Sequence, residues 1–346
     1  MSRRSFIYLI IFFIGIIVLL LSYILYNYFS GQIVWKSVEN MGVIEKHYIY
    51  FGQLDGLGKE DQADIAPPVV GVMIDNHPDA YPQSGISQAP IVYEVPVEGG
   101  ITRFMAVYPG VNFSVNKVGP VRSARPYFLD WLAEYGDALY LHSGGSPEAL
   151  SLIKERKIFD ANEFWWGEYY WRDNDQDAPH NLFTSSSNWG AIIRETGAKH
   201  PLVAWQGWNY SDTLVVTNTQ LVRGIKINYT SGYKVEWTWD TLKNSFTRAV
   251  NGSTSTFESE IVAQNIIVQY VNVRSIDEID RKKITTVGSG EARVLRDGFL
   301  IRGSWKKEDL SSRTRFYDEN NQEISLKPGI TWVQIVSKDA VVEVTS

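Results

Sequence analysis

The chain has 346 residues, of which 44% are hydrophobic and 21% are charged, and it contains no cysteine. The chain is long enough for two folded domains. The absence of cysteine excludes disulfides, zinc–thiolate sites, thiol nucleophiles and lipid attachment through cysteine. The net charge of −6 argues against nucleic acid as a partner, since no stripe of lysine and arginine offsets it.

An uncharged, apolar stretch near the start of the chain, residues 6–29, predicts a transmembrane helix. At a rise of about 1.5 Å per residue it is long enough to cross the ~30 Å hydrocarbon core of a bilayer. Arg3 and Arg4 precede it, which places the N-terminus in the cytoplasm. Its length and the lack of a small-residue cleavage motif favour an uncleaved signal anchor. We therefore predict a single-pass protein of the cell membrane whose C-terminal domains are extracytoplasmic.

Residues 67–210 alternate between strand-like and helix-like patterns, which predicts an α/β domain. We expect strands at 69–74, 91–97, 101–108 and 138–143. Helices are expected at 126–136, from Pro147 with Ser146 as its cap, and from about Asn188 to Thr196 with Ser186 or Ser187 as the cap.

The other segments carry different patterns. Residues 1–30 are assigned to the anchor, and residues 31–66, with several acids, glycines and a proline pair at the end, to a stalk or linker. Residues 211–346 contain short runs of β-branched and aromatic residues separated by turn signals. This pattern predicts a mostly-β domain, either a sandwich or a small barrel.

The first candidate site is Asp75, Asn76 and His77, directly after the expected strand 69–74. Ligands often bind at strand ends in α/β sheets. Asp75 and His77 could act as a metal pair or as an acid–base pair. The alternative is a turn before Pro78 in which these side chains bond only the local backbone.

The second candidate is Glu94 with Glu98 and Arg103. If the strand continues to residue 98, Glu94 and Glu98 point to the same face, as a carboxylate pair for glycosidic acid catalysis would require. A solvated strand face, or a Glu98–Arg103 pair across the hairpin, explains the same residues.

The third candidate is the loop that carries Arg122, Ser123 and Arg125 into an expected helix. Guanidinium groups match phosphate or carboxylate in a bidentate manner, so this loop predicts an anion site. Internal salt bridges to Glu94 or Glu98 are the alternative.

Two further loops complete the candidate set. His142, Ser143 and Ser146 lie in a glycine loop between a strand and a helix, a shape that can present backbone N–H groups to an anion, although it is neither a Walker A loop nor a nucleophile elbow. His180 and Asn181 follow a proline, and His180 could serve as a ligand or a base. The catalytic role is unassigned, with Asp75, Glu98, His142 and His180 as candidates. We predict no metal, and no cofactor is identified.

Long motifs resemble the YerB lipoprotein family of bacteria. They are DNHPDAYPQSGISQAPIVYEVPVEGGITRF, VGPVRSARPYF, HSGGSP and APHN in the first part of the chain, and QNIIVQ, GSGEARVLRDGFLIRGSWKK and KPGITWVQIV in the second. The resemblance covers about residues 67–340. It implies an exported, membrane-attached envelope protein without established cofactor or catalytic residues. Typical members are attached through a lipidated cysteine, which this chain lacks, so the helix at 6–29 would take over that role.

These observations predict an envelope protein that is a binding or accessory factor for peptidoglycan or its synthesis machinery. The expected partners are the membrane, a glycan or another anionic envelope ligand, and cell-wall synthesis proteins. The alternative is an enzyme acting on envelope glycan or a polyprenyl-phosphate-linked substrate. For that reading the anchor and clustered arginines superficially resemble the LytR-CpsA-Psr glycan transferases, without a shared motif. A purely structural role is the third hypothesis.

Overall fold

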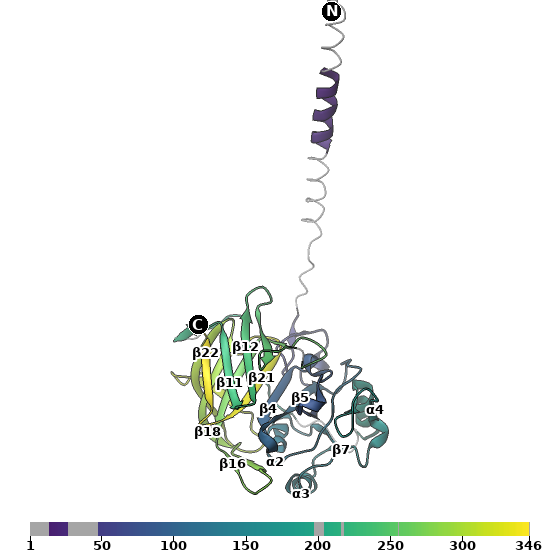
Figure 1. Ribbon diagram of the computed structural model, residues 1–346, viewed down its shortest axis with the longest axis vertical. Coiled ribbons are helices and arrows are strands. Elements are labelled where there is room, and N and C mark those ends of the chain that lie inside the picture. Colours follow the sequence, from purple (N-terminus) through teal and green to yellow (C-terminus); the bar gives the residue numbers. More distant parts are fainter. Residues whose placement is uncertain (1–13, 27–47, 197–203, 216–217, 255, 346) are drawn as a thin grey trace, which may run out of the picture. The chain divides into compact units, whose positions relative to one another are not determined.

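The computed structural model describes residues 14–26, 48–196, 204–215, 218–254 and 256–345 (Figure 1). The chain divides into two compact units, residues 1–48 and residues 49–346. Each unit is considered by itself.

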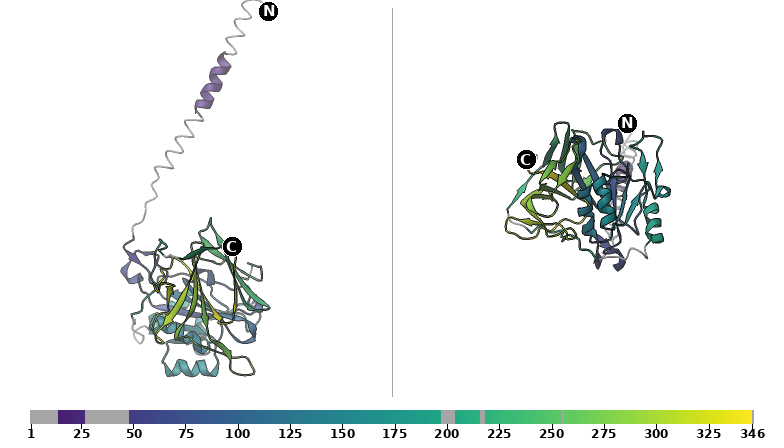
Figure 2. Two further views of the ribbon diagram at one scale, coloured as in Figure 1. Left: turned by 90° about the vertical axis from the view of Figure 1, so that its left-hand side faces the viewer. Right: turned by 90° about the horizontal axis from the view of Figure 1, so that it is seen from below.

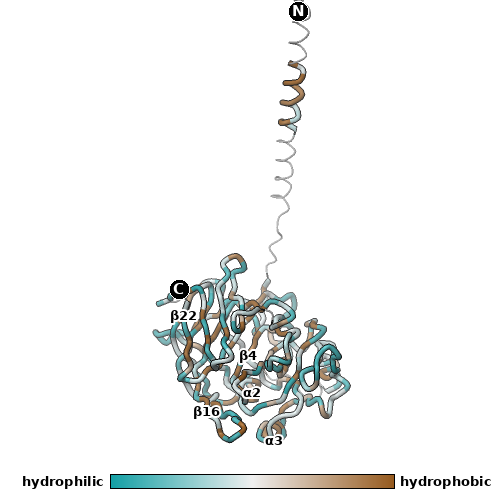
Figure 3. The backbone as a smooth tube through the Cα atoms, viewed as in Figure 1, coloured by the Kyte–Doolittle hydropathy of each residue, from teal (hydrophilic) through white to brown (hydrophobic). Residues whose placement is uncertain are grey.

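The first unit contains a helix over residues 14–26, which is exposed along its length and apolar over most of it (Figure 3). Within the described residues, no helix is both long enough and apolar enough to cross a membrane. The predicted span of residues 6–29 extends at both ends into 1–13 and 27–47, which lie outside the described residues.

A mixed sheet of 11 strands runs through the second unit. Its order is β10-β19-β18-β15-β21-β4-β5-β3-β6-β7, with β20 paired to β19. The strands are β3 (Val69–Ile74), β4 (Ile91–Pro96), β5 (Thr102–Pro109), β6 (Leu139–His142), β7 (Asp160–Asn162), β10 (Thr219–Leu221), β15 (Asn265–Val271), β18 (Gly288–Arg296), β19 (Phe299–Lys307), β20 (Arg315–Asp318) and β21 (Thr331–Ser337). The parallel pairing of β21 with β4 joins the two sequence regions into one sheet.

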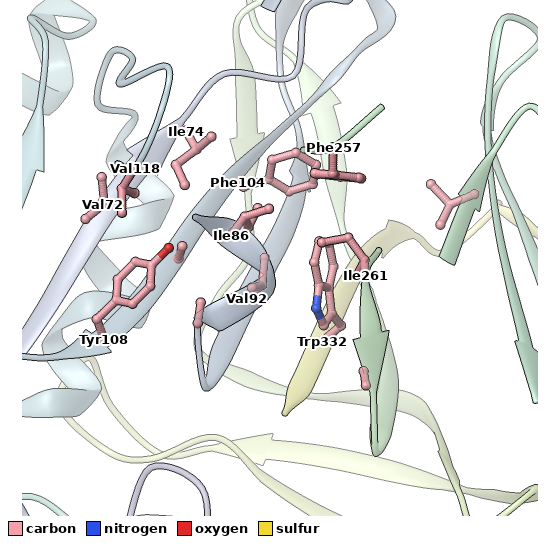
Figure 4. Packing of buried hydrophobic residues seen from close by; sticks show 14 of the residues in the cluster. Val72, Ile74, Ile86, Val92, Phe104, Tyr108, Val118, Phe257, Ile261 and Trp332 are labelled. Carbon is pink, nitrogen blue, oxygen red and sulfur yellow. The ribbon is translucent and has the colours of Figure 1, made fainter. Parts of the chain in front are cut away.

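A second, antiparallel sheet of five strands covers part of one face of the large sheet. Its order is β14 (Val262–Ala263), β13 (Ser245–Val250), β12 (Tyr233–Asp240), β11 (Gly224–Thr230) and β22 (Val341–Thr345). Phe104, Phe257 and Trp332 pack in the core between the sheets (Figure 4). The later part of the chain is therefore a two-sheet sandwich, one of the two predicted forms.

Three helices flank the first part of the large sheet: α2 (Pro126–Leu132), α3 (Pro147–Glu155) and α4 (Ser186–Thr196). They lie on the side of the body that carries β4, β5 and β7 (Figure 1 and Figure 2). The helix α2 also contacts the C-terminal strand β19, whose Lys307 Nζ donates to Asp130 O at 3.0 Å. All six residues of β3 are buried, because α2 packs against one face of this sheet region and α4 against the other.

The predicted helices are all present, and two boundaries differ. The helix expected at 126–136 is α-helical only to Leu132 and continues as the 3-10 helix η5 (Ala133–Tyr135). Ser146 caps α3 by accepting a hydrogen bond from Ala149 N at 3.3 Å, as predicted. The helix α4 begins at Ser186, and Ser185 Oγ accepts from Asn188 N at 3.4 Å, so the cap lies one residue before the predicted serines. The observed content is mostly β with some helices. The first region has a mixed sheet, because β5 is antiparallel to both β3 and β4 while β3 is parallel to β6.

Residues 49–66, assigned to a stalk or linker from composition, belong to the second compact unit. They contain β1 (Tyr50–Phe51), β2 (Gly58–Lys59) and the short 3-10 helix η1 (Gln62–Asp64). Leu54 is buried, and its carbonyl accepts a hydrogen bond from Tyr210 Oη at 2.6 Å. This long-range contact has no local sequence signal, which is why composition misassigned the segment.

The remaining described elements are short. They are the hairpins β8 (Trp171–Arg172) with β9 (Leu182–Phe183) and β16 (Val273–Ser275) with β17 (Lys282–Ile284), and the 3-10 helices η2 (Pro78–Ala80), η3 (Ile86–Gln88), η4 (Glu98–Gly100), η5 (Ala133–Tyr135) and η6 (Gly167–Tyr169).

Candidate functional site

Three segments meet beyond the end of β3. The backbone of residues 118–124 runs beside β3, since Asp75 N bonds Pro120 O at 2.8 Å and Arg122 N bonds Met73 O at 2.9 Å. The segment 180–184 lies on the other side of that loop, where Val121 N donates to Leu182 O at 2.6 Å. These backbone bonds bring residues far apart in sequence to one edge.

Asp75 is the centre of the group that these segments form. Its Oδ2 lies 2.9 Å from Arg122 Nε and 2.8 Å from His180 Nδ1, and its Oδ1 accepts from His77 N at 3.1 Å. Burial raises the pKa of Asp75, but Arg103, Arg122 and the His180 hydrogen bond more than offset burial and lower it below its ordinary value. Asp75 is therefore a buried carboxylate that holds an arginine and an imidazole in place.

Arg122 and His180 each have nitrogen atoms that do not contact Asp75 and that make no hydrogen bond to a described residue. The side chain of Arg122 is 27% exposed, and its two terminal nitrogens make no hydrogen bond to a described residue. His180 Nε2 likewise has no hydrogen-bond partner among the described residues. The structure thus brings together Asp75, Arg122 and His180 from three separate sequence candidates.

His77 and Asp79 lie beside this group. The rings of His77 and His180 stack with centroids 4.8 Å apart, and Asp79 Oδ2 is 3.4 Å from His77 Nδ1. His77 Nδ1 also accepts from Asp79 N at 3.2 Å, the local turn bond that the sequence offered as an alternative. Asp79 was missed in the sequence, although its position two residues after His77 could have indicated it.

Arg103 and Arg125 add positive charge next to Arg122. Burial and the proximity of Arg125 lower the pKa of Arg103 to about 10, and its Nε is buried without a described partner. Arg103 Nη1 donates to Ser123 O at 3.0 Å, so Ser123 contributes its carbonyl oxygen. Arg125 Nε lies 2.6 Å from Glu98 Oε1, one of the internal pairs left open by the sequence.

The charges of this arginine cluster do not balance. Burial raises the pKa of Glu98, but the hydrogen bond and charge of Arg125 more than offset burial and lower it below its ordinary value. Two carboxylates, Asp75 and Glu98, therefore face three guanidinium groups, Arg103, Arg122 and Arg125. The excess positive charge favours an anion at this edge.

Glu94 does not form the expected carboxylate pair with Glu98. The strand β4 ends at Pro96 and Glu98 lies in η4, so the period-two argument that placed both on one face does not apply. Gly99 adopts a positive φ of 74°, which glycine accommodates without strain and which turns the chain toward β5. Glu94 is fully buried and pairs with Arg248 of β13, whose Nη2 lies 2.9 Å from Oε2.

The Glu94–Arg248 pair is the centre of a polar network between the two sheets. Tyr233 Oη and Thr102 Oγ1 donate to Glu94 Oε1 at 2.6 and 2.8 Å. Asn76 Nδ2 donates to Thr102 Oγ1 and Tyr233 Oη, both at 2.6 Å. Asn76 thus belongs to this structural network and not to the group around Asp75. Arg248, Thr102 and Tyr233 were missed in the sequence, because nothing local distinguishes them.

The remaining candidates make internal contacts. His142 is buried between Gly144 O, 2.7 Å from Nδ1, and Asp160 Oδ2, 3.2 Å from Nε2. Ser143 Oγ donates to Glu163, and Asn181 Nδ2 donates to Asp173 O at 3.1 Å.

Three backbone amides of the glycine loop donate to other parts of the protein. The N–H groups of Ser143, Gly144 and Ser146 donate to Arg122 O, Asn162 Oδ1 and Ala124 O respectively. Two of these bonds go to the backbone of residues 122–124, so the loop helps to hold the segment that carries Arg122 and Arg125 in place.

A second buried charge network borders a cavity of about 940 Å³. Glu134 there accepts from Lys307 Nζ at 2.7 Å, Arg313 Nη1 at 3.3 Å and Thr314 Oγ1 at 2.6 Å. The residues that line this cavity include none of the group around Asp75.

Comparisons with known proteins agree with the motifs. Residues 54–199 match the family described as Protein of unknown function (DUF3048) N-terminal domain, and residues 225–333 match the corresponding C-terminal domain. The chain is 30% identical over 295 residues to Putative lipoprotein YerB from Bacillus subtilis (strain 168), covering 82% of this chain and 85% of that protein. The crystal structure of YerB protein from Bacillus subtilis matches with a TM-score of 0.73 and 27% identity, over 85% of this chain and 99% of that one. The chain therefore belongs to the YerB-like family with DUF3048 N- and C-terminal domains.

Proposed function

We propose that this chain is a membrane-associated, extracytoplasmic envelope protein that binds an anionic ligand through Arg122. As a binding or accessory factor it would serve peptidoglycan or its synthesis machinery. The description of its Bacillus subtilis relative as a putative lipoprotein supports the location, and Arg3 and Arg4 before an apolar stretch support the orientation.

The geometry of Arg122 is the observation that carries the proposal. Asp75 holds the Nε side of the guanidinium, and the terminal nitrogens have no described partner. A guanidinium fixed on one side offers a planar pair of donors to a carboxylate or phosphate with little further loss of entropy. Arg103 and Arg125 add attraction without being needed for direct contact. Peptidoglycan stem peptides carry carboxylates, which fit this chemistry.

Replacing Arg122 by glutamine is expected to weaken binding of soluble peptidoglycan fragments about 10- to 100-fold, because hydrogen bonds to a charged group contribute roughly 1.5–3 kcal/mol. Isothermal titration of the purified full-length protein in detergent measures this. Arg302→Gln is the matched control, since Arg302 is an exposed residue of β19 and the charge change is the same. Wild-type affinity in Arg122→Gln, or equal weakening in Arg302→Gln, would contradict the assignment.

The second candidate is an enzyme acting on envelope glycan or a polyprenyl-phosphate-linked substrate. It is favoured by the 2.8 Å contact between Asp75 Oδ2 and His180 Nδ1, together with a His180 Nε2 that has no hydrogen-bond partner among the described residues. A carboxylate that orients an imidazole in this way is a common arrangement for a general base.

If this candidate holds, His180→Gln is expected to slow turnover of a labelled lipid-linked glycan by about 10²–10⁴-fold while binding changes little. Product formation by the purified full-length protein is the measurement. If the wild-type protein shows no turnover with Mg²⁺ or Mn²⁺ supplied, the enzymatic role is contradicted and the binding role is retained.

A further inference from the structure

Two imidazoles and a carboxylate gather at the edge of the site. His77, Asp79 and His180 each offer one ligand atom, and these atoms all lie within 4.8 Å of one another. Imidazole nitrogens with a carboxylate oxygen are the donors that zinc and related divalent transition metals prefer. The simpler explanation is a ring stack next to a turn, in which His77 Nδ1 only accepts the Asp79 N–H bond.

The simpler explanation does not account for the hydrogen bond that orients the ring of His180. Its Nδ1 is held by Asp75 Oδ2 at 2.8 Å, while its Nε2 has no described hydrogen-bond partner. Metal-ligating histidines almost always place their second nitrogen on a carboxylate, a carbonyl or water, which fixes the tautomer and the ring orientation. Asp75 is itself 1% exposed and fixed by Arg122 and by His77 N. The ring of His180 is therefore already oriented so that Nε2 can coordinate a metal ion.

We propose that His77, Asp79 and His180 form a binding site for a divalent transition metal of the zinc class, with Asp75 as a positioning residue. Three protein ligands leave a coordination position open. The site as it stands must contract, because ligand atoms bound at about 2.0–2.2 Å in a tetrahedron lie roughly 3.3 Å apart.

His77 and Asp79 are the residues able to make that movement. Their side chains are 43% and 72% exposed, against 13% for His180. His77 must turn out of the stack with His180, because two nearly parallel rings 4.8 Å apart cannot both point their lone pairs at one ion. The movement gives up one ring contact and one turn hydrogen bond.

Metal titration of the full-length protein tests the proposal. After removal of metal by a chelator, isothermal titration with Zn²⁺ is expected to show one ion bound per chain. Mg²⁺, which prefers oxygen ligands, is expected to give no comparable binding.

His77→Ala and Asp79→Ala are each expected to weaken Zn²⁺ binding by about 100-fold or more, since even residues that only hydrogen-bond the metal ligands account for roughly 10–100-fold. The matched control is Asp175→Ala, which removes an exposed acid from the loop before His180 and should leave the affinity unchanged.

Asp75→Asn tests the positioning role, with an expected loss of about 10–100-fold in Zn²⁺ affinity and an unchanged stoichiometry. If this buried variant does not fold, the two exposed variants still decide the question. Zinc affinity in His77→Ala and Asp79→Ala equal to that of the wild type would overturn the proposal, and so would a wild-type protein that binds no Zn²⁺. The anion titrations with Arg122→Gln are made on metal-free protein. Failure of the metal site and failure of anion binding through Arg122 can therefore be told apart.

Discussion

Replacing Arg248 by methionine is expected to lower the free energy of unfolding by about 3–5 kcal/mol, the usual cost of removing one partner from a buried ion pair. Arg248 and Glu94 are both fully buried in their side chains. Without the guanidinium, the carboxylate of Glu94 keeps, among the described residues, only its bonds from Thr102 and Tyr233. Chemical denaturation of the purified full-length protein measures the loss.

The aromatic residues around Arg248 add to this cost. The guanidinium carbon lies 5.1 Å from the ring centroid of Trp332 and 5.2 Å from that of Phe257. Such cation–π contacts stabilise a desolvated guanidinium by as much as about 2 kcal/mol. They also explain how Nε and Nη1, which have no described hydrogen-bond partner, remain buried. Burial lowers the pKa of Arg248, but Glu94 and Tyr233 more than offset burial and raise it above its ordinary value, so the group stays charged.

A double variant separates the ion pair from general packing. Adding Glu94→Gln to Arg248→Met removes the buried negative charge and keeps an oxygen that accepts from Thr102 and Tyr233, so most of the loss should be recovered. Lys226→Met is the control, because the Lys226–Glu236 pair is about one-third exposed and should contribute below about 1 kcal/mol. A double variant as unstable as Arg248→Met would mean that packing, and not the unpaired charge, is responsible.

Glu134→Gln is expected to destabilise the protein by about 3–5 kcal/mol as well, because it leaves two buried cations without their counter-charge. The side chains of Lys307 and Arg313 are 0% and 3% exposed, and both point at this one carboxylate. Burial lowers the pKa of Lys307 despite the opposing effect of Glu134. The measurement is again the shift of the denaturation midpoint.

Lys307→Met provides the contrast at the same site. Here Glu134 still has Arg313 and Thr314, and the guanidinium of Arg313 still stacks 3.7 Å from the ring centroid of Trp208. The loss should therefore be clearly smaller than in Glu134→Gln. Equal losses in the two variants would show that the lysine, and not the balance of charge around the carboxylate, holds this network together.

The Glu94 network also has a consequence for the site. Asn76 donates to Thr102 and Tyr233, and Gln83 Nε2 reaches both Asn76 Oδ1, at 3.0 Å, and the backbone oxygen of Asp75, at 3.2 Å. The residues after β3 are thus tied to the C-terminal sheet on one side, while Asp75 faces Arg122 and His180 on the other. We expect damage to the Glu94–Arg248 pair to loosen the site as well as the fold.

Local patterns in the sequence determined much of the architecture. The buried run at residues 69–74 is β3, and the serine–proline pair at 146–147 starts α3. Among the short β-rich runs expected within 211–346, residues 224–230 are β11 and residues 331–337 are β21. Hydrophobic runs, caps and turn residues act over a few positions, so they are visible without a fold. The long motifs likewise identified the family.

Only the tertiary structure decided which polar residues share a site. The sequence selected Asp75, Arg122 and His180 separately, and backbone pairing of three distant segments placed them around one carboxylate. It also paired Glu94 with Arg248, 154 residues away, and left Glu98 to Arg125. Buried charges must find partners, but which partner is near depends on how strands cross in space, and no local pattern records that. The sequence by itself therefore determined the elements, the family and a pool of candidates. The pairing of distant strands and loops determined which candidates lie in buried networks and which lie around Asp75 with nitrogen atoms that have no described partner.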